Sequence, residues 1–329
     1  MKLTRLFMAL ILSSCAIFTA FIGVNQINSE KSVVDKSEYK GIISVWQVDG
    51  FEGGIGSRKQ FLLKSARSFE KKNNGLLVMV TDRTPEGVKE DFKKGVYPDL
   101  ISYSVGTEVI GISELNVERK VSGGKIGGKD YATAWCRGGY LLITNPKLVT
   151  NVSKIDKLLV SQAEYTLPLI ALLESGIQVD NVEVLPPFDA YLKFVSGKTP
   201  YFLATQRDII RLNNRGMEVN ATPLDGFSDL YQYISITATD QQKRYYANEF
   251  INHLTSDDVQ KDLDKIGLMS AFYPSAHENQ VLSLMQSTKI KSTVSAFLSP
   301  VQIKELQSLS QKAVMGDEDA LNKIKNVLV

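Results

Sequence analysis

The chain reads IISVWQVDGFEGGIGSR from Ile42 to Arg58. The first seven residues are an apolar strand candidate, and the glycine-rich loop after them leads into an amphipathic segment, 57–72. Apolar residues recur in that segment at near-helical spacing, which predicts a helix with one buried face that begins after Ser57 as its N-cap. A second strand candidate, 76–80, follows. The stretch therefore predicts a β-α-β unit in which the two strands pair in parallel.

Composition is ordinary for a globular protein. The chain has 329 residues, of which 43% are hydrophobic and 22% charged. This length suffices for two domains or for one large α/β domain. The 38 Lys and Arg residues nearly balance the 36 Asp and Glu residues, and no block of like charge stands out. A nucleic-acid partner is therefore not expected.

The N-terminus has the pattern of a membrane-targeting segment. Lys2 and Arg5 precede an apolar run of about 19 residues, 6–24, which is long enough to span a bilayer. Within that run, Leu12-Ser-Ser-Cys15 fits a bacterial lipobox, so Cys15 is a candidate for lipidation, and an uncleaved signal anchor is the alternative. We expect residues 1–24 to be a signal peptide or membrane anchor and 25–40 to be a tether. The remainder is expected to be extracytoplasmic and attached to the cell membrane.

Cysteine and histidine are too few for a disulfide framework or a metal cluster. Beyond the apolar run the chain has one cysteine, Cys136, and its two histidines are His253 and His277. A single thiol forms no internal disulfide, and the count excludes a Cys/His metal site. Neither histidine is spaced from a nucleophile in an interpretable way. We therefore expect no enzyme activity, no metal and no cofactor, although two carboxylates across a cleft would allow glycosidase chemistry.

Strand and helix signals alternate along the rest of the chain. Strand candidates lie at 100–104, 201–204 and 231–236, and a longer extended stretch, 131–144, is interrupted by Gly138-Gly139. Those two glycines are a candidate bend where the chain leaves one lobe for another. Helix candidates follow apolar periodicity, caps and stops at 167–175, 188–196, 208–216, 247–254, 256–267, 300 onward and 320–328.

Four segments in this order resemble bacterial extracellular solute-binding proteins of ABC importers. The segment 42–71 is similar to the start of that family, and Tyr97-Pro-Asp-Leu-Ile101 to its Pro-Asp-apolar segment. The segment 131–145 resembles its lobe-crossing strand, and 247–260 its C-terminal signature. The resemblance covers residues from about 40 to 329 and favours the carbohydrate-type branch, as found in Gram-positive firmicutes.

The resemblance implies an α/β, two-lobed periplasmic-binding-protein-like fold of the class II type, with a ligand cleft between the lobes. It places 41–143 and 234–282 in lobe I, and 144–233 and 283–329 in lobe II. It further implies a monomeric receptor that binds a small polar solute, with a carbohydrate favoured, by lobe closure and delivers it to an ABC permease. Two alternatives remain: a ligand sensor of the same fold that signals to a membrane kinase, and a receptor for an anionic solute.

The glycine-rich loop is the first candidate for ligand contact. Glycines let a backbone approach a ligand closely, and a helix N-terminus presents free N–H groups. The loop fits neither common phosphate-binding fingerprint, so nucleotide chemistry is not expected. A structural turn with a capped helix is the alternative interpretation. The candidates from this loop are Asp49, Glu52, Gly53, Gly54, Ser57 and Arg58.

Aromatic and polar residues near other strand ends are further candidates. Trp46 and Trp135 suit the apolar face of a sugar ring, and core packing is the alternative for both. Gln206-Arg207-Asp208, at a strand-to-helix turn, offers donors and acceptors for several hydroxyls or one carboxylate; a cap with a surface pair is the alternative. The remaining candidates near the expected crossovers are Tyr103, Arg137, Tyr231 and Tyr233. Together Arg58, Arg137 and Arg207 would also suit an anion site.

Overall fold

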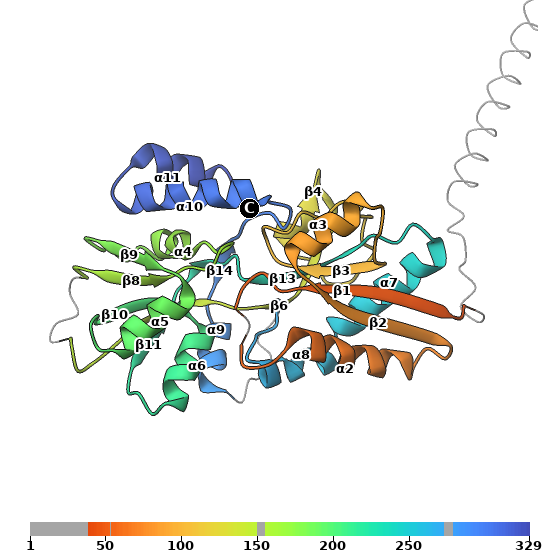
Figure 1. Cartoon of the computed structure of the whole chain (residues 1–329), viewed down its shortest axis with the longest axis horizontal. Coiled ribbons are helices and arrows are strands. Elements are labelled where there is room, and N and C mark those ends of the chain that lie inside the picture. Colours follow the sequence, from red (N-terminus) through yellow and green to blue (C-terminus); the bar gives the residue numbers. More distant parts are fainter. Residues whose placement is uncertain (1–38, 53, 150–154, 273–278) are drawn as a thin grey trace, which may run out of the picture. The chain divides into compact units, whose positions relative to one another are not determined.

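Two five-stranded sheets organise Lys40–Val329 (Figure 1). The computed structural model describes residues 39–52, 54–149, 155–272 and 279–329. The first sheet has the strand order β2-β1-β3-β13-β6, and the second has the order β11-β7-β10-β8-β9. We call each sheet with its helices lobe I and lobe II respectively. The expected anchor, the candidate lipidation site Cys15, Gly53 and His277 lie outside the described residues.

Lobe I begins with the predicted β-α-β unit. Strand β1 (Gly41–Val48) pairs in parallel with β2 (Leu76–Arg83) and β3 (Leu100–Tyr103), while β13 (Tyr231–Ile236) runs antiparallel to both β3 and β6 (Thr133–Arg137). Helices α2 (Arg58–Glu70) and α8 (Asp257–Gln260) lie on one side of the sheet and α3 (Pro85–Lys93) on the other (Figure 1). Helix α7 (Gln241–Leu254) contacts α2. The α/β class predicted from alternating elements is confirmed for this lobe.

The first helix forms as its sequence predicts. The Ser57 hydroxyl accepts a hydrogen bond from the Gln60 backbone N–H at 3.3 Å, which satisfies one free donor of the first turn. Its buried face consists of Phe61, Leu62, Ala66 and Phe69, the residues at near-helical spacing, together with Arg58 and Ser65. Ser57 is therefore a helix cap, and its placement supports the structural interpretation of this residue.

Lobe II contains the second sheet. Strands β8 (Leu158–Ser161), β9 (Val182–Leu185) and β10 (Tyr201–Thr205) are parallel, and β7 (Tyr140–Thr144) runs antiparallel to β10 and to β11 (Asn220–Pro223). Its helices are α4 (Pro168–Ser175), α5 (Pro187–Val195), α6 (Gln206–Asn214), α9 (Gln280–Gln286), α10 (Pro300–Val314) and α11 (Glu318–Lys325). Shorter elements are β4 (Lys125–Ile126), β5 (Lys129–Asp130), β12 (Gly226–Phe227), β14 (Ile290–Ser292) and the 3-10 turns η1 (Ser122–Gly124) and η2 (Lys261–Ile266).

The chain changes sheets at Gly138-Gly139, where the sequence predicts a bend. Strand β6 ends at Arg137 in the first sheet and β7 starts at Tyr140 in the second. The chain returns to the first sheet between β12 and β13. These two crossing segments contact each other, because the Gly138 N–H donates a hydrogen bond to the Leu230 carbonyl at 2.7 Å. Glycine suits this position because a Cβ on Gly138 would lie 2.9 Å from the Gln206 amide group.

The expected lobe boundaries differ from the division of the strands between the two sheets. A boundary after residue 143 falls inside β7, and one after 233 falls inside β13, although each strand pairs within a single sheet. A boundary after 282 falls inside α9, whose Leu282 and Met285 belong to the core of lobe II. The sequence shows where a chain bends, but strand pairing over long separations decides to which sheet a strand belongs.

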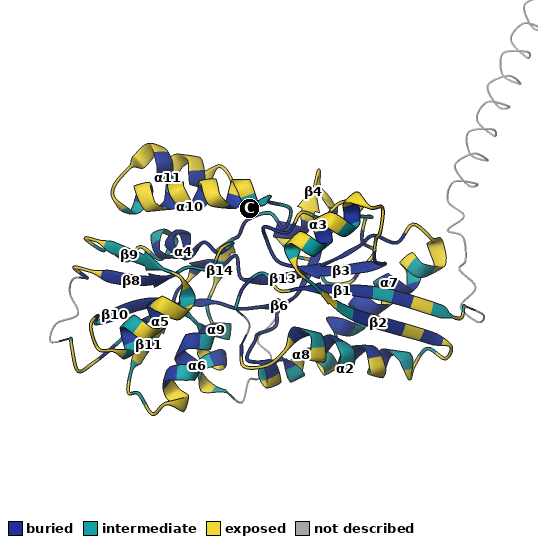
Figure 2. Ribbon diagram, in the orientation of Figure 1, coloured by how far each residue is buried: buried dark blue, intermediate teal, exposed yellow. Residues whose placement is uncertain are grey.

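Burial follows the sheets. Strands β3, β13 and β6 are buried along their whole length, and the outward faces of the helices are exposed (Figure 2). The core of lobe II joins Phe194 of α5, Phe202 of β10 and Leu282 of α9. Within residues 39–52, 54–149, 155–272 and 279–329, no helix has the length and apolar character needed to cross a membrane.

Candidate functional site

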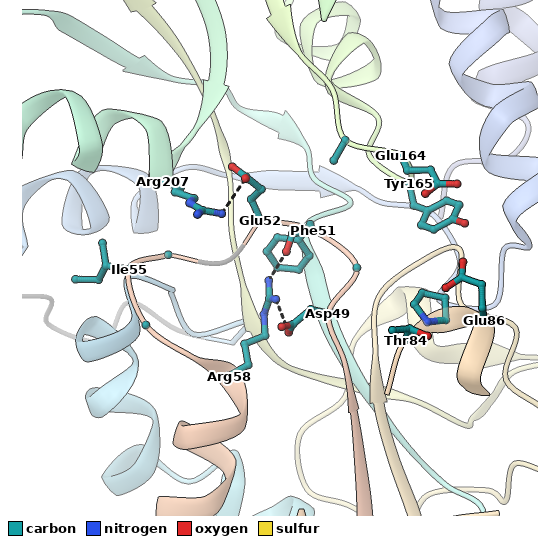
Figure 3. Close-up of a pocket in the computed structure, with 15 residues that line it drawn as sticks. Asp49, Phe51, Glu52, Ile55, Arg58, Thr84, Glu86, Glu164, Tyr165 and Arg207 are labelled. Carbon is teal, nitrogen blue, oxygen red and sulfur yellow. Dashed lines mark hydrogen bonds and ion pairs between the residues drawn. The ribbon is translucent and has the colours of Figure 1, made fainter. Parts of the chain in front are cut away.

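A cavity of about 620 Å³ is lined by residues of both lobes (Figure 3). Its lining comes from four segments: the loop after β1, the start of α3 after β2, the loop after β8, and the first turn of α6 after β10. Each segment follows the carboxyl end of a strand that has a parallel partner, which is where open α/β sheets bind ligands. The lining residues are Asp49, Gly50, Phe51, Glu52, Gly54, Ile55, Gly56, Arg58, Thr84, Pro85, Glu86, Ala163, Glu164, Tyr165 and Arg207.

Arg58 holds the loop after β1 in place. Its Nη1 lies 2.7 Å from Asp49 Oδ1, and its Nη2 donates to the Phe51 carbonyl at 3.0 Å. The guanidinium also lies 4.1 Å from the centroid of the Phe51 ring, an arrangement that attracts a cation to the ring face. Only 3% of Arg58 is exposed. This arginine therefore already has a carboxylate, a carbonyl and an aromatic ring as partners within its own loop.

The glycines of this loop allow it to pack against another segment of lobe I. The Ile55 N–H donates to the Ile266 carbonyl at 3.0 Å. A Cβ on Gly54 would lie 2.1 Å from that same carbonyl oxygen, and one on Gly56 would lie 2.8 Å from Cγ2 of Ile266. Gly54 lines the cavity as well, so its lack of a side chain serves both the protein contact and the cavity wall.

An ion pair crosses the cavity from one lobe to the other. Arg207 Nη1, on the first turn of α6, lies 2.8 Å from Glu52 Oε1, in the loop after β1 (Figure 3). The two side chains are 34% and 30% exposed. Glu52 Oε2 is shielded from solvent and has no hydrogen-bond partner among the described residues. This carboxylate oxygen is therefore unsatisfied within the described part of the protein.

The wall formed by α3 is set by a helix start. The Thr84 hydroxyl accepts from the Gly87 N–H at 3.1 Å, and Pro85 occupies the first helical position. Glu86 lies in the first turn, where the partial positive charge of the helix N-terminus stabilises a carboxylate. Local sequence alone therefore fixes the position of this acidic group on the wall.

Glu164 and Tyr165 come from the loop after β8. The Gln307 Nε2 of α10 donates to three carbonyls of this loop, those of Ala163, Glu164 and Thr166, at 3.4, 3.0 and 3.0 Å. Tyr165 contacts lobe I, because a Cβ on Gly106 would lie 2.7 Å from its Cγ. Burial, a hydrogen bond to Glu164 and the charges of neighbouring glutamates raise the pKa of Tyr165 to about 12.

Five of the predicted site residues line this cavity: Asp49, Glu52, Gly54, Arg58 and Arg207. The tryptophans do not. Trp135 is fully buried, stacks on Phe61 with 5.4 Å between ring centroids, and donates from Nε1 to Ser102 Oγ at 2.9 Å. Trp46 is 4% exposed and stacks on Phe92. The prediction that Trp135 faces the cleft is therefore wrong, and Trp46 also belongs to the core of lobe I.

The predicted tyrosines and Arg137 lie at the crossings and not on the cavity wall. Tyr103 and Tyr233 are fully buried, and the Tyr103 hydroxyl shares a hydrogen bond with Ser235 Oγ at 3.0 Å. Tyr231 pairs with Arg137 in the register of β13 and β6. Arg137 donates from Nη2 to the Met285 carbonyl at 3.4 Å. None of these four side chains lines the cavity, and all four pack beside the crossings; their role in ligand binding stays a prediction.

Gln206 and Asp208 have structural roles around Arg207. Gln206 is fully buried and its Oε1 accepts from the Gly139 N–H at 3.0 Å, which ties α6 to the crossing. Asp208 completes a capping box with Thr205 at the start of α6, as in the alternative interpretation from sequence. Burial raises the pKa of Asp208 to about 6. The expected surface pair of Arg207 with Asp208 is not formed, because Arg207 pairs with Glu52.

Sequence reasoning missed several lining residues, among them Phe51, Thr84, Glu86, Glu164 and Tyr165. A usable signal existed for one segment, since Thr84-Pro85-Glu86 after a strand is a helix start. The run Leu158-Leu-Val160 is a short apolar strand signal that would have placed the next loop at a strand end. No local pattern indicated that these loops meet the one after β1.

Neither Cys136 nor His253 lines the cavity. Cys136 is fully buried, and burial raises the pKa of its thiol to about 12, so the nucleophilic thiolate is disfavoured. His253 Nε2 lies 2.6 Å from Ser68 Oγ on the helical side of lobe I. Within the described ranges no three His, Cys, Asp or Glu side chains gather as a metal site.

Comparisons with known proteins identify the fold. The sequence matches no protein-family model and no curated protein. Among solved structures, it superposes on a cyclo/maltodextrin-binding protein complexed with maltotetraose with a TM-score of 0.59 and 17% identity, covering 88% of this chain and 97% of that chain. The sugar-binding protein MalE from Xanthomonas citri gives a TM-score of 0.60 and 12% identity, with coverages of 87% and 96%.

A third solved structure broadens the range of ligands associated with this fold. The Atu4243–GABA receptor superposes with a TM-score of 0.56 and 15% identity, covering 82% of this chain and 97% of that chain. All three are binding proteins or receptors, and each is covered almost entirely. The chain therefore has the two-lobed α/β fold of periplasmic solute-binding proteins.

Proposed function

We propose that this chain is an extracytoplasmic solute receptor that binds a small polar ligand in the cavity between its lobes and delivers it to an ABC permease. The observation that carries the proposal is the cavity itself. Its volume of about 620 Å³ is in the range of small-molecule sites, roughly 300–1,000 Å³. Its walls come from the carboxyl ends of strands in two different sheets.

Binding works by lobe closure. A ligand that touches the loop after β1 in lobe I and the loop after β8 in lobe II favours the arrangement in which these walls face each other. The crossings at Gly138-Gly139 and near Leu230 connect the two sheets, so changes of backbone angle there move one wall against the other.

A carbohydrate is the favoured ligand. The lining offers carboxylates, arginines, the Thr84 hydroxyl and the Tyr165 ring, a combination that suits the hydroxyls and the apolar face of a sugar. Two of the solved structures with this fold are sugar-binding proteins, and one contains maltotetraose. The similarity to these two structures supports the assignment of a carbohydrate ligand.

An anionic ligand is less well supported. Both arginines that line the cavity already have carboxylate partners, Arg58 with Asp49 and Arg207 with Glu52. Arg137, the third arginine of the expected anion site, lies beside the crossing and does not line the cavity. An entering anion would have to compete with two existing ion pairs.

Location and attachment rest on the sequence. The positive and apolar pattern of 1–24 supports export, and Leu12-Ser-Ser-Cys15 supports either lipidation at Cys15 or an uncleaved anchor. Both place the folded lobes outside the cytoplasm and close to a membrane permease. Mass spectrometry of the intact protein from cells separates the two, because signal peptidase cuts a lipoprotein before its lipid-modified cysteine, here Cys15, whereas an uncleaved anchor keeps residues 1–14.

The binding function is tested by a thermal-shift screen of the full chain in detergent against neutral sugars, amino sugars, sugar acids, amino acids and simple anions. We expect a sugar to raise the melting temperature with a saturable dose dependence, because a ligand that binds only the folded state stabilises it by mass action. Hits confined to anions would overturn the sugar assignment, and the absence of any hit would overturn the receptor function.

Delivery to a permease is tested in cells. Deletion of the chain is expected to abolish uptake of the radiolabelled hit ligand, and re-expression restores it. Uptake that persists while a transcriptional response to the ligand is lost would support the sensor alternative instead.

A further inference from the structure

The cavity lining carries more negative than positive charge. Four carboxylates line it, against two guanidinium groups, which leaves an excess of two negative charges. Arg58 and Arg207 are engaged with Asp49 and Glu52 at 2.7 and 2.8 Å. The excess therefore belongs to the two lining carboxylates that remain, Glu86 and Glu164.

Those two carboxylates have no close ion-pair partner among the described residues. No ion pair within the described part of the chain involves Glu86, and Glu164, which also has a hydrogen bond with the Tyr165 hydroxyl, pairs with Lys304 at 3.9 Å. Both members of that pair are more than 60% exposed, so their attraction is weak and screened by salt. The fold thus leaves two negative groups facing the cavity.

Tyr165 lies between them. Figure 3 shows its ring on the same side of the cavity as Glu86 and Glu164, with one carboxylate above and the other below. Burial raises the pKa of its hydroxyl to about 12, and the charges of Glu164, Glu86 and Glu108 contribute in the same direction. The carboxylates of Glu86 and Glu164 are therefore close enough to Tyr165 to act on its hydroxyl. An aromatic face flanked by carboxylates is a favourable place for an organic cation.

Glu52, in the loop after β1, is a further hydrogen-bond acceptor on the cavity wall. Glu52 Oε2 is shielded from solvent without a hydrogen-bond partner among the described residues, while its other oxygen binds Arg207. The Glu52 side chain is 30% exposed and lines the cavity, so a ligand that spans the cavity can place a hydroxyl or N–H group against this carboxylate beside its ion pair with Arg207.

We infer that the ligand carries a protonated amine, which binds beside Tyr165 between Glu86 and Glu164 while a hydroxyl or N–H donor of the same molecule reaches Glu52. The chemical class is an amino sugar or a similar polyhydroxylated amine. This inference rests on the proposed function and goes further, since it selects among polar solutes by charge. A cavity whose lining carries an excess of negative charge raises the local concentration of cations and disfavours anionic ligands.

Sugars of similar shape that differ in charge test the inference directly. Glucosamine is cationic, glucose neutral and glucuronate anionic. Each of them, and its β-1,4-linked dimer, is titrated calorimetrically into the full chain in detergent at pH 7. We expect the amines to bind at least about tenfold more tightly than the neutral sugars, and the acids to give no saturable signal. Raising the ionic strength from about 20 mM to 500 mM should reduce the ratio of amine affinity to neutral-sugar affinity severalfold, because salt screens charges at exposed sites.

Two conservative variants locate the effect. Glu86→Gln and Glu164→Gln remove charge at nearly constant shape, and both positions are exposed, so the variants are expected to fold. Each should reduce the ratio of amine affinity to neutral-sugar affinity, and the double variant should bring that ratio to about one. Glu114→Gln is the matched control, because Glu114 pairs with Lys129 outside the cavity and its loss should leave that ratio unchanged.

The outcomes separate this inference from the proposed function. A neutral sugar that binds as tightly as the amine, with no change in the Glu86→Gln and Glu164→Gln variants, would overturn the cationic ligand but keep the sugar receptor. Tight binding of the acids would overturn it in the same way. Failure of every probe, up to millimolar concentration, would count against both.

Discussion

Arg207 Nη1 lies 2.8 Å from Glu52 Oε1, and this ion pair joins α6 of lobe II to the loop after β1 of lobe I. Both side chains are about one-third exposed, so the pair contributes little to the free energy of unfolding. We expect its effect on the arrangement of the two lobes, because it links one cavity wall of lobe II to one of lobe I. In the proposed complex, a ligand donor and Arg207 would share the Glu52 carboxylate.

Arg207→Gln is expected to shift the ligand-free protein toward more open arrangements while changing the free energy of unfolding by less than about 1 kcal/mol. Small-angle scattering of Lys40–Val329 measures the first effect as a larger radius of gyration, and denaturant unfolding measures the second. Lys59→Gln is the control, because its pair with Asp82, 3.0 Å apart, lies entirely within lobe I. An unchanged radius of gyration in Arg207→Gln would show that the pair does not restrain the lobes.

Gly54→Ala should destabilise the protein by on the order of 1–3 kcal/mol. The added methyl group would meet the Ile266 carbonyl oxygen at 2.1 Å, and a backbone atom cannot rotate away as a side chain can. Thermal unfolding of the variant measures the loss. Gly87→Ala is the matched control, since its nearest contact is Thr84 Oγ1 at 3.2 Å and its helical position gains up to about 1 kcal/mol from alanine. Equal stability of the two variants would contradict the packing argument.

Asp208→Asn should remove part of the protein's pH dependence. Burial raises the pKa of Asp208 to about 6 in the folded state, above the ordinary value of 3.8. The folded state therefore holds this proton more tightly than the unfolded state does, so the parent loses stability as pH rises from about 4 to about 6 and regains none above. The asparagine variant should be more stable than the parent at pH 7 by on the order of 1–3 kcal/mol, with no difference near pH 4.

Urea denaturation at intervals from pH 4 to pH 8 gives the difference between variant and parent directly. Asp229, whose pKa burial also raises to about 6, remains in both proteins and cancels in that difference. Asp189→Asn, an exposed acid in the first turn of α5, is the control and should lose a few tenths of a kcal/mol at pH 7 through the helix dipole. If the difference in free energy of unfolding between Asp208→Asn and the parent did not change with pH, a raised pKa of Asp208 would be ruled out.

Trp135→Phe should cost on the order of 1–3 kcal/mol of stability and leave ligand affinity unchanged. The substitution removes the hydrogen bond from Nε1 to Ser102 Oγ and reduces a side chain that is fully buried against Phe61. Denaturant unfolding and calorimetric titration with the screened ligand measure the two quantities. A large loss of affinity at unchanged stability would return Trp135 to the binding site.

Local patterns in the sequence determined much of the fold. Local signals placed α2, β13 and the start of α10 within a residue or two, because such signals depend on neighbours a few residues apart. The Gly138-Gly139 bend marked the point where the chain changes sheets. The glycine-rich loop was correctly assigned to the end of the first strand, and it supplies much of the cavity lining.

Only the tertiary structure decided which side chains meet in the cavity. Its walls bring together Glu52, Glu86, Tyr165 and Arg207, which no short-range pattern links. Trp135 lies on a strand buried on both faces, so alternation along the strand could not tell core from cleft. The charge balance depends on which carboxylate each arginine reaches, and pairing through space is set by the packing of whole lobes rather than by residue spacing.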